Sequence, residues 1–172
     1  TRREGEEIAW PAARRAMALA PDSGEANLAL AVVMEGREAV EQFDGALELL
    51  PNHAMAHIWA ANARQGDPGP NWLEALALLE KAVELDPLAP NPRTQLARQL
   101  LFMHRHDEAI RQLRIVMEAN PDYAPARGFM AWATSELGDF DESMDWSRRY
   151  ISLDARSGPA QGERITTLGQ LR

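Results

Sequence analysis

Small and apolar residues recur along the chain at helical spacing, and each group precedes a proline. The prolines, with an alanine in the fifth place, are Pro21, Pro51, Pro87, Pro121 and Ala155. The residues twelve positions earlier are Ala9, Ala39, Ala75, Ala109 and Ser143. The residues five positions earlier are Ala16, Ala46, Ala82, Val116 and Tyr150. Proline cannot continue a helix, so the pattern predicts a helix of about four turns that ends at each of these positions.

A second helix is predicted after each proline, because an alanine recurs ten residues on and an apolar residue lies beside it. The alanines are Ala31, Ala61, Ala97 and Ala131. Successive prolines and Ala155 are separated by 30, 36, 34 and 34 residues. The difference in length falls in the turn between the two helices, where a surface connection buries little and tolerates insertion. The longest turn, residues 65–70, is rich in glycine and proline.

Polar residues mark several predicted helix starts. Candidate capping boxes are Asn71 with Glu74, Asp139 with Glu142, and Asp22 with Glu25. Asn91 before Pro92 predicts a further start, with proline at the first helical position. Together these signals predict one domain over residues 1–172. It contains helix pairs at 22–51, 52–87, 88–121 and 122–155, a flanking helix at 5–20 and a C-terminal capping helix at 158–171.

A period near 34, paired helices, small residues at close-packing positions and a terminal proline resemble the tetratricopeptide repeat. The unit at residues 91–121 carries this resemblance most fully. The resemblance implies an all-α, right-handed α-solenoid, in which the first helix of each pair lines a concave groove. The chain departs from the pattern at Pro11, which lies inside the flanking helix, and at Tyr150 and Ala155 in the last unit.

A finer resemblance covers residues 85–90 and 100–114, which are similar to repeats of bacterial one-component regulators. Those proteins carry a winged-helix or adenylate-cyclase module ahead of their repeats. Three functions therefore stay open. The first is a scaffold that binds a protein or peptide, the second is a regulatory or sensory domain of a signalling protein, and the third is an accessory domain of a larger enzyme.

The net charge of −8 reduces the classes of molecule that the chain is expected to bind. A phosphate backbone or an anionic membrane surface requires a positive face, so direct nucleic-acid binding is not expected. No stretch approaches the ~20 apolar residues of a membrane-spanning helix, so membrane insertion is not expected either. A cytoplasmic location is predicted, or a periplasmic one within a membrane-anchored regulator.

Candidate chemistry is sparse, and we predict a chain without enzymatic activity, cofactor or metal. Cysteine is absent, which excludes disulfides and thiolate nucleophiles. His53 and His57 share a predicted helix face, and His104 and His106 lie in a turn, yet no carboxylate accompanies them in a ligand motif. The acids at residues 139–142 match helix capping better than an acid–base pair.

The predicted binding surface is the concave face formed by the first helix of each pair. This face is defined by the positions four, seven, eleven and fourteen residues after each proline. Its residues are Met55, Ile58, Asn62, Asn91, Thr94, Arg98, Leu101, Trp132 and Ser135. This mixture suits an extended peptide or a partner helix, with Arg98 and Trp132 as the strongest anchors. The alternative is that apolar members such as Ile58 and Trp132 are covered by neighbouring helices. Self-association into a homo-oligomer is a further possibility.

Overall fold

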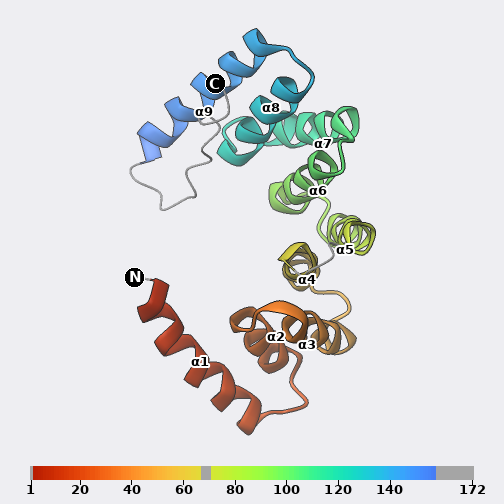
Figure 1. Cartoon of the computed structure of the whole chain (residues 1–172), viewed down its shortest axis with the longest axis vertical. Helices are drawn as coiled ribbons and strands as arrows, with labels where there is room; N and C mark the ends of the chain where they lie inside the picture. Colours follow the sequence, from red (N-terminus) through yellow and green to blue (C-terminus); the bar gives the residue numbers. More distant parts are fainter. Residues whose placement is uncertain (1, 67–70, 158–172) are drawn as a thin grey trace. The chain divides into compact units, whose positions relative to one another are not determined.

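The computed structural model describes residues 2–66 and 71–157, and helices are the regular elements of these ranges (Figure 1). The helices are α1 (Arg2–Leu19), α2 (Gly24–Val33), α3 (Gly36–Leu49), α4 (Ala54–Gly66), α5 (Trp72–Leu85), α6 (Pro90–Phe102), α7 (His106–Ala119), α8 (Ala124–Glu136) and α9 (Phe140–Ser157). The predicted all-α class and helical repeat solenoid are confirmed. The capping helix predicted at 158–171 lies outside the described residues.

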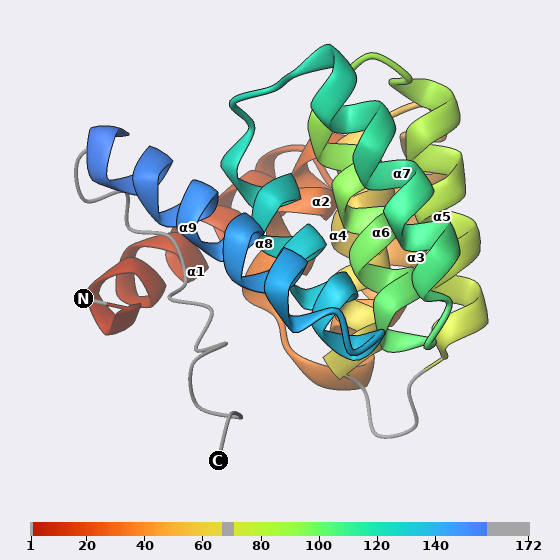
Figure 2. The ribbon, with the colours of Figure 1, turned by 90° about the horizontal axis from the view of Figure 1, so that it is seen from above.

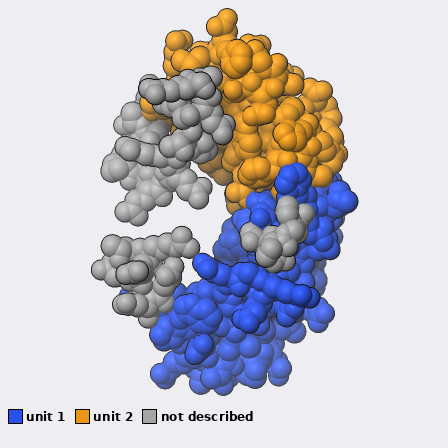
Figure 3. All heavy atoms as spheres, viewed as in Figure 1, with its two compact units in different colours: residues 1–87 blue, residues 88–172 orange. Residues whose placement is uncertain are grey.

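The chain divides into two compact units, residues 1–87 and residues 88–172 (Figure 3). In the first unit each helix from α1 to α5 contacts the next one along the chain. In the second unit α6, α7, α8 and α9 do the same, and α6 also contacts α8. Figure 2 shows α6 and α7 lying side by side as one helix pair. Contacts are therefore local in sequence, as expected for stacked helix pairs.

The core of both units is built on the small residues of the repeating pattern. The alanines with no exposed surface include Ala31, Ala46, Ala61, Ala75, Ala82, Ala97 and Ala109. Larger residues such as Leu79 and Leu113, eight positions before a proline, are also fully buried. A methyl side chain lets two helix backbones approach closely, and the leucines fill the space beside that contact.

Helix ends follow the predicted chemistry at two places and differ at two others. The side chains of Asn71 and Asp139 accept hydrogen bonds from first-turn amides, as predicted. At α2 the predicted cap, Asp22, is wrong, because the hydroxyl of Ser23 accepts from the amide of Ala26 at 3.3 Å.

The predicted start of α6, with Asn91 as the N-cap and Pro92 as the first helical residue, is also wrong. The N-cap is Ala89, and α6 begins two residues earlier than predicted, at Pro90. Proline suits the first helical position since its missing N–H has no partner there in any helix. Pro92, two residues on, still lies in the first turn, where a missing donor costs nothing.

Two glycines with positive φ permit tight connections. Gly36 (φ 67°) opens α3 after a link of only Met34 and Glu35, and Gly138 (φ 81°) lies between α8 and α9. This left-handed conformation favours glycine because it has no Cβ. The short link before Gly36 holds the end of α2 close to the start of α3.

Arg64 joins three helices of the first unit from a buried position. Its guanidinium donates to Asp44 of α3 at 2.5 Å, to Glu74 of α5 at 3.1 Å and to the Ala60 carbonyl oxygen of α4 at 3.2 Å. The arginine side chain is 9% exposed, whereas the two carboxylates are 52% and 57% exposed. The cation is thus compensated while its partners stay hydrated, which avoids the full cost of burying an ion pair.

We predict that Ala82→Leu lowers the free energy of unfolding by ~1–3 kcal/mol, because extra methylenes overpack a filled contact. Urea denaturation followed by circular dichroism measures the change. Ala77→Leu is the matched control, since Ala77 is exposed on the same helix. Equal stability of the two variants would show that α5 does not pack through Ala82.

We predict that Arg64→Met lowers the free energy of unfolding by ~1–3 kcal/mol, because three hydrogen bonds of one buried cation are lost. Arg37→Met is the control, since Arg37 pairs with Glu41 on an exposed helix surface and such pairs contribute about 0–0.5 kcal/mol. Thermal melts of both variants make the comparison. A loss in Arg37→Met as large as that in Arg64→Met would contradict the role assigned to the buried cation.

Candidate functional site

Three of the nine residues predicted to line the groove lie in the core instead. Ile58 and Leu101 are 2% exposed, and Thr94 is fully buried. The Thr94 hydroxyl donates to the Pro90 carbonyl oxygen at 2.7 Å, so it serves its own helix. Side chains in these positions contact neighbouring helices and do not face a ligand from the solvent side.

The reason is a rotation of the exposed surface relative to the predicted face. Successive residues of an α-helix turn by about 100°. Ile58 and Thr94, seven residues after their prolines, therefore lie on the same side of the predicted face as Leu101, and all three are buried. Trp59, eight residues after Pro51, lies beyond the other edge and is 36% exposed. The accessible surface is thus displaced toward Trp59, a residue the prediction leaves out.

The other six predicted residues are partly exposed and divide between the units. Those in α4 of the first unit are Met55 and Asn62, and those in α6 and α8 of the second unit are Asn91, Arg98, Trp132 and Ser135. Each unit therefore offers its own candidate surface.

The first unit contains an open hollow of about 480 Å³ between α2, α3 and α4. Ala31, Ala39 and Phe43 form its buried, apolar floor. Trp59 borders it, together with Val32, which is 50% exposed. The remaining lining residues include Met34, Glu35, Asn62 and Ala63. Apolar surface open to solvent beside polar side chains is typical of a ligand-binding surface.

In the second unit the rings of Phe102 and Phe129 lie close to the ring of Trp132. The ring of Phe102, at the end of α6, meets Trp132 edge-on with centroids 5.2 Å apart. Phe129 lies 6.4 Å from Trp132 on the same helix. The indole N–H of Trp132 donates to a Glu136 carboxylate oxygen at 3.2 Å. Trp132 is therefore held by α6 and α8, and part of its surface remains open.

Two further hollows of the second unit are lined mainly by charged residues. One, of about 480 Å³, lies between α7, α8 and α9, and its lining includes Arg111, Arg114, Asp139 and Glu142. The smaller, of about 320 Å³, lies at the start of α7 and includes His104, Arg105, His106, Glu108 and Leu137. Both signs of charge line each hollow, so neither presents a uniform field to a ligand.

Within residues 2–66 and 71–157, two carboxyl groups and one phenol have pKa values that the surrounding structure displaces. Hydrogen bonds from Arg105, at 2.6 and 2.8 Å, hold the pKa of Glu108 below its ordinary value. A backbone amide and then the Ser23 hydroxyl lower the pKa of Glu25 at the start of α2. Burial raises the pKa of Tyr123.

The histidines predicted to share a face of α4 take structural positions. Nδ1 of His53 accepts from the Ala56 amide at 3.1 Å, which caps the helix. Nε2 of His57, a buried residue, lies 2.9 Å from the Pro51 carbonyl oxygen and donates to it. Both residues thus contribute to the local fold through one ring nitrogen, while Nδ1 of His57 is buried without a hydrogen-bond partner in the described part of the chain.

A further finding concerns the membrane. Among the helices of residues 2–66 and 71–157, none combines the length and the apolar composition needed to cross a bilayer.

Residues 71–133 match the family model described as "Tetratricopeptide repeat". Among solved structures, one of MamA superposes with a TM-score of 0.71 at 18% identity, covering 91% of this chain and 93% of that one. A second MamA structure gives 0.70 at 17% identity, covering 95% and 90%. A MamA RS-1 double mutant gives 0.71 at 16% identity, covering 92% and 90%. At these identities the likeness shows the fold. No protein of curated function matches the sequence significantly.

We predict that Arg105→Gln raises the pKa of Glu108 toward its ordinary value, because the charged hydrogen bonds are lost. Stability from this lowered pKa is present above the unfolded-state value and is lost as the pH falls through the folded-state value. The variant is therefore expected to lose less stability than wild type on acidification through that window.

A ¹³C-detected titration of the glutamate side chains measures the pKa, with Glu118 as an exposed internal reference on the same helix. A Glu108 pKa that is the same in both proteins would contradict the assigned cause.

Proposed function

This chain is a tetratricopeptide repeat protein, and on that premise we propose that it is a non-catalytic scaffold that binds a partner protein or peptide. Repeats of this family are interaction modules, and their stacked helices present side chains for a ligand to contact. The proposed binding surface is the hollow between α2, α3 and α4 of the first unit.

The observation that carries this proposal is apolar surface that the fold leaves open. Val32 and Trp59 retain half and about a third of their exposure, beside a floor of buried alanine and phenylalanine. A partner side chain that covers them removes apolar area from water, at roughly 25 cal/mol per Å². The shallow, open form of the hollow suits one anchoring side chain of a peptide better than an enclosed small molecule.

Polar residues beside the hollow would orient the peptide. Asn62 carries an amide that can pair with both the N–H and the C=O of an extended backbone. Trp59 supplies a large rigid surface and an indole N–H donor, the combination that often dominates binding energy at interfaces. The proposed ligand is therefore a protein segment with one apolar anchor. The net charge of −8 disfavours nucleic acid in its place.

We predict that Trp59→Ala weakens binding of a peptide selected against the chain by about 2 kcal/mol or more, which is roughly 30-fold in Kd. The peptide is selected from a displayed random library on the purified chain, and its Kd is measured by isothermal titration calorimetry. Ala63→Leu, which narrows the hollow, should also weaken binding.

Trp72→Ala is the matched control. It removes an equally exposed tryptophan, 38% against 36%, that does not line the hollow. Selected peptides that bind Trp72→Ala more weakly and bind Trp59→Ala with unchanged affinity would contradict the proposed binding surface.

A further inference from the structure

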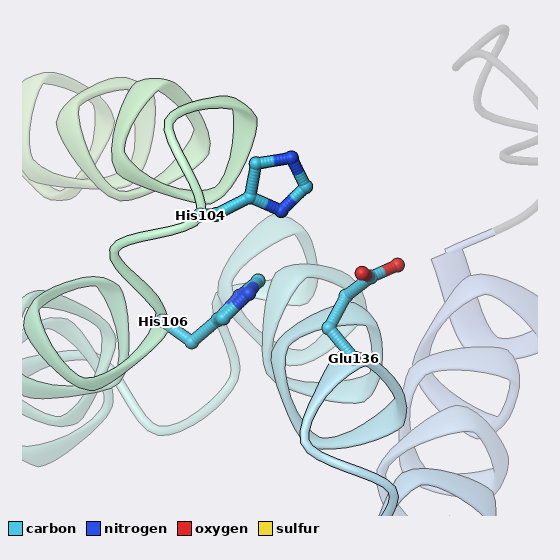
Figure 4. A group of neighbouring side chains, drawn as sticks. All are labelled: His104, His106 and Glu136. Carbon is cyan, nitrogen blue, oxygen red and sulfur yellow. The ribbon is translucent and has the colours of Figure 1, made fainter.

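Two histidines and one glutamate of the second unit converge on a common space (Figure 4). His104 comes from the turn between α6 and α7, His106 is the first residue of α7, and Glu136 is the last residue of α8. One ring nitrogen of each histidine and one carboxylate oxygen all lie within 4.8 Å of one another. The two imidazole centroids are 5.7 Å apart. Helix packing brings Glu136 to histidines that lie about thirty residues earlier in the sequence.

We propose that His104, His106 and Glu136 bind a divalent transition-metal ion, with Zn²⁺ as the ion best suited to them. Imidazole nitrogen and carboxylate oxygen are zinc ligands, with metal–ligand distances of about 2.0–2.2 Å. Around a tetrahedral ion at these distances, two ligand atoms lie about 3.4 Å apart. The 4.8 Å limit on their present separations means that each pair has to close by at most about 1.5 Å. His104 and Glu136 are exposed and His106 is half-buried, so rotation of exposed side chains can supply this closure. Water completes the coordination.

The state of His106 supports a metal ligand at this position. Its Nδ1 is enclosed by protein and has no hydrogen-bond partner in the described part of the chain. An enclosed polar atom without a partner is unfavourable, and metal coordination is one way in which imidazole nitrogens are satisfied.

Neighbouring residues favour a cation at this place. The Trp132 indole N–H donates to the Glu136 carboxylate at 3.2 Å, and such outer hydrogen bonds orient metal ligands. Arg105, which lies between the two histidines in sequence, directs two donors to Glu108 at 2.6 and 2.8 Å. Its positive charge is thereby paired with a carboxylate beside the site. His104 has a φ of 57°, a conformation in which histidine is enriched among non-glycine residues.

The test is a calorimetric titration of ZnCl₂ into the full chain without an affinity tag. One equivalent of Zn²⁺ is expected to bind. Glu136→Gln and His106→Ala should weaken binding by more than the 10–100-fold that loss of an outer hydrogen bond typically causes. Trp132→Phe removes only the hydrogen bond from the indole N–H to Glu136. This variant should therefore bind Zn²⁺ about 10–100-fold more weakly than wild type. His104→Gly removes the third ligand and keeps a residue suited to positive φ.

His53→Ala is the matched control, because it removes an exposed histidine outside the cluster. Co²⁺ gives a second readout, since a tetrahedral or five-coordinate site produces visible absorption that Glu136→Gln should abolish. Zinc binding that is equal in wild type, Glu136→Gln and His106→Ala would overturn the proposal. Binding lost in His53→Ala and kept in the cluster variants would overturn it as well.

Discussion

The close approach of neighbouring helices at fully buried alanines is the constraint on which the structure depends. Each alanine removes the side chain that would otherwise separate two backbones, and the leucines around it fill the remaining space. The arrangement recurs with the repeat, at Ala46 and Ala82 in one helix of a pair and at Ala31 and Ala97 in the other. The same contact, repeated along the chain, produces helix pairs whose packing is local.

The candidate surfaces follow from this packing. Where α2 and α3 are joined by a link of two residues, their ends lie close to α4 and leave an open hollow bordered by Trp59. At the turn between α6 and α7, the packing of α8 brings Glu136 beside two histidines. The hollow lies between helices of the first unit, and the histidine–glutamate cluster lies between helices of the second unit. They depend on how one helix is placed on the next, and the alanine contacts determine that placement.

The sequence predicted the parts of the fold that are periodic. Alanines at fixed offsets from Pro51, Pro87 and Pro121 identified the close contacts, because a small residue is required wherever two helices cross closely. The equivalent residues before Pro21, Ala9 and Ala16, are only partly buried. The predicted caps at Asn71 and Asp139 are also confirmed, because a cap depends on hydrogen bonds between residues that are close in sequence. The start of α6 was misplaced because Pro90 and Pro92 both suit a first turn.

Predictions of the site depended on non-local contacts and were less successful. Periodicity defined a helix face but not which edge of it the next helix covers, so Ile58 and Thr94 were placed in the groove and Trp59 was missed. The tryptophan itself was the available signal, because a large aromatic residue one position beyond a predicted face often marks a rotated surface. No motif links Glu136 to His106, since their approach depends on the packing of α8.

Hydrogen–deuterium exchange of wild type and Ala82→Leu tests the central role of alanine packing most directly. Cooperative units in a protein open separately, and stability in stacked helices is largely a sum of neighbouring contacts. The substitution should therefore speed amide exchange in α4 and α5 and leave α7 and α8 with their original protection. Unchanged exchange in α4 and α5, or an equal loss of protection in all four helices, would contradict the account.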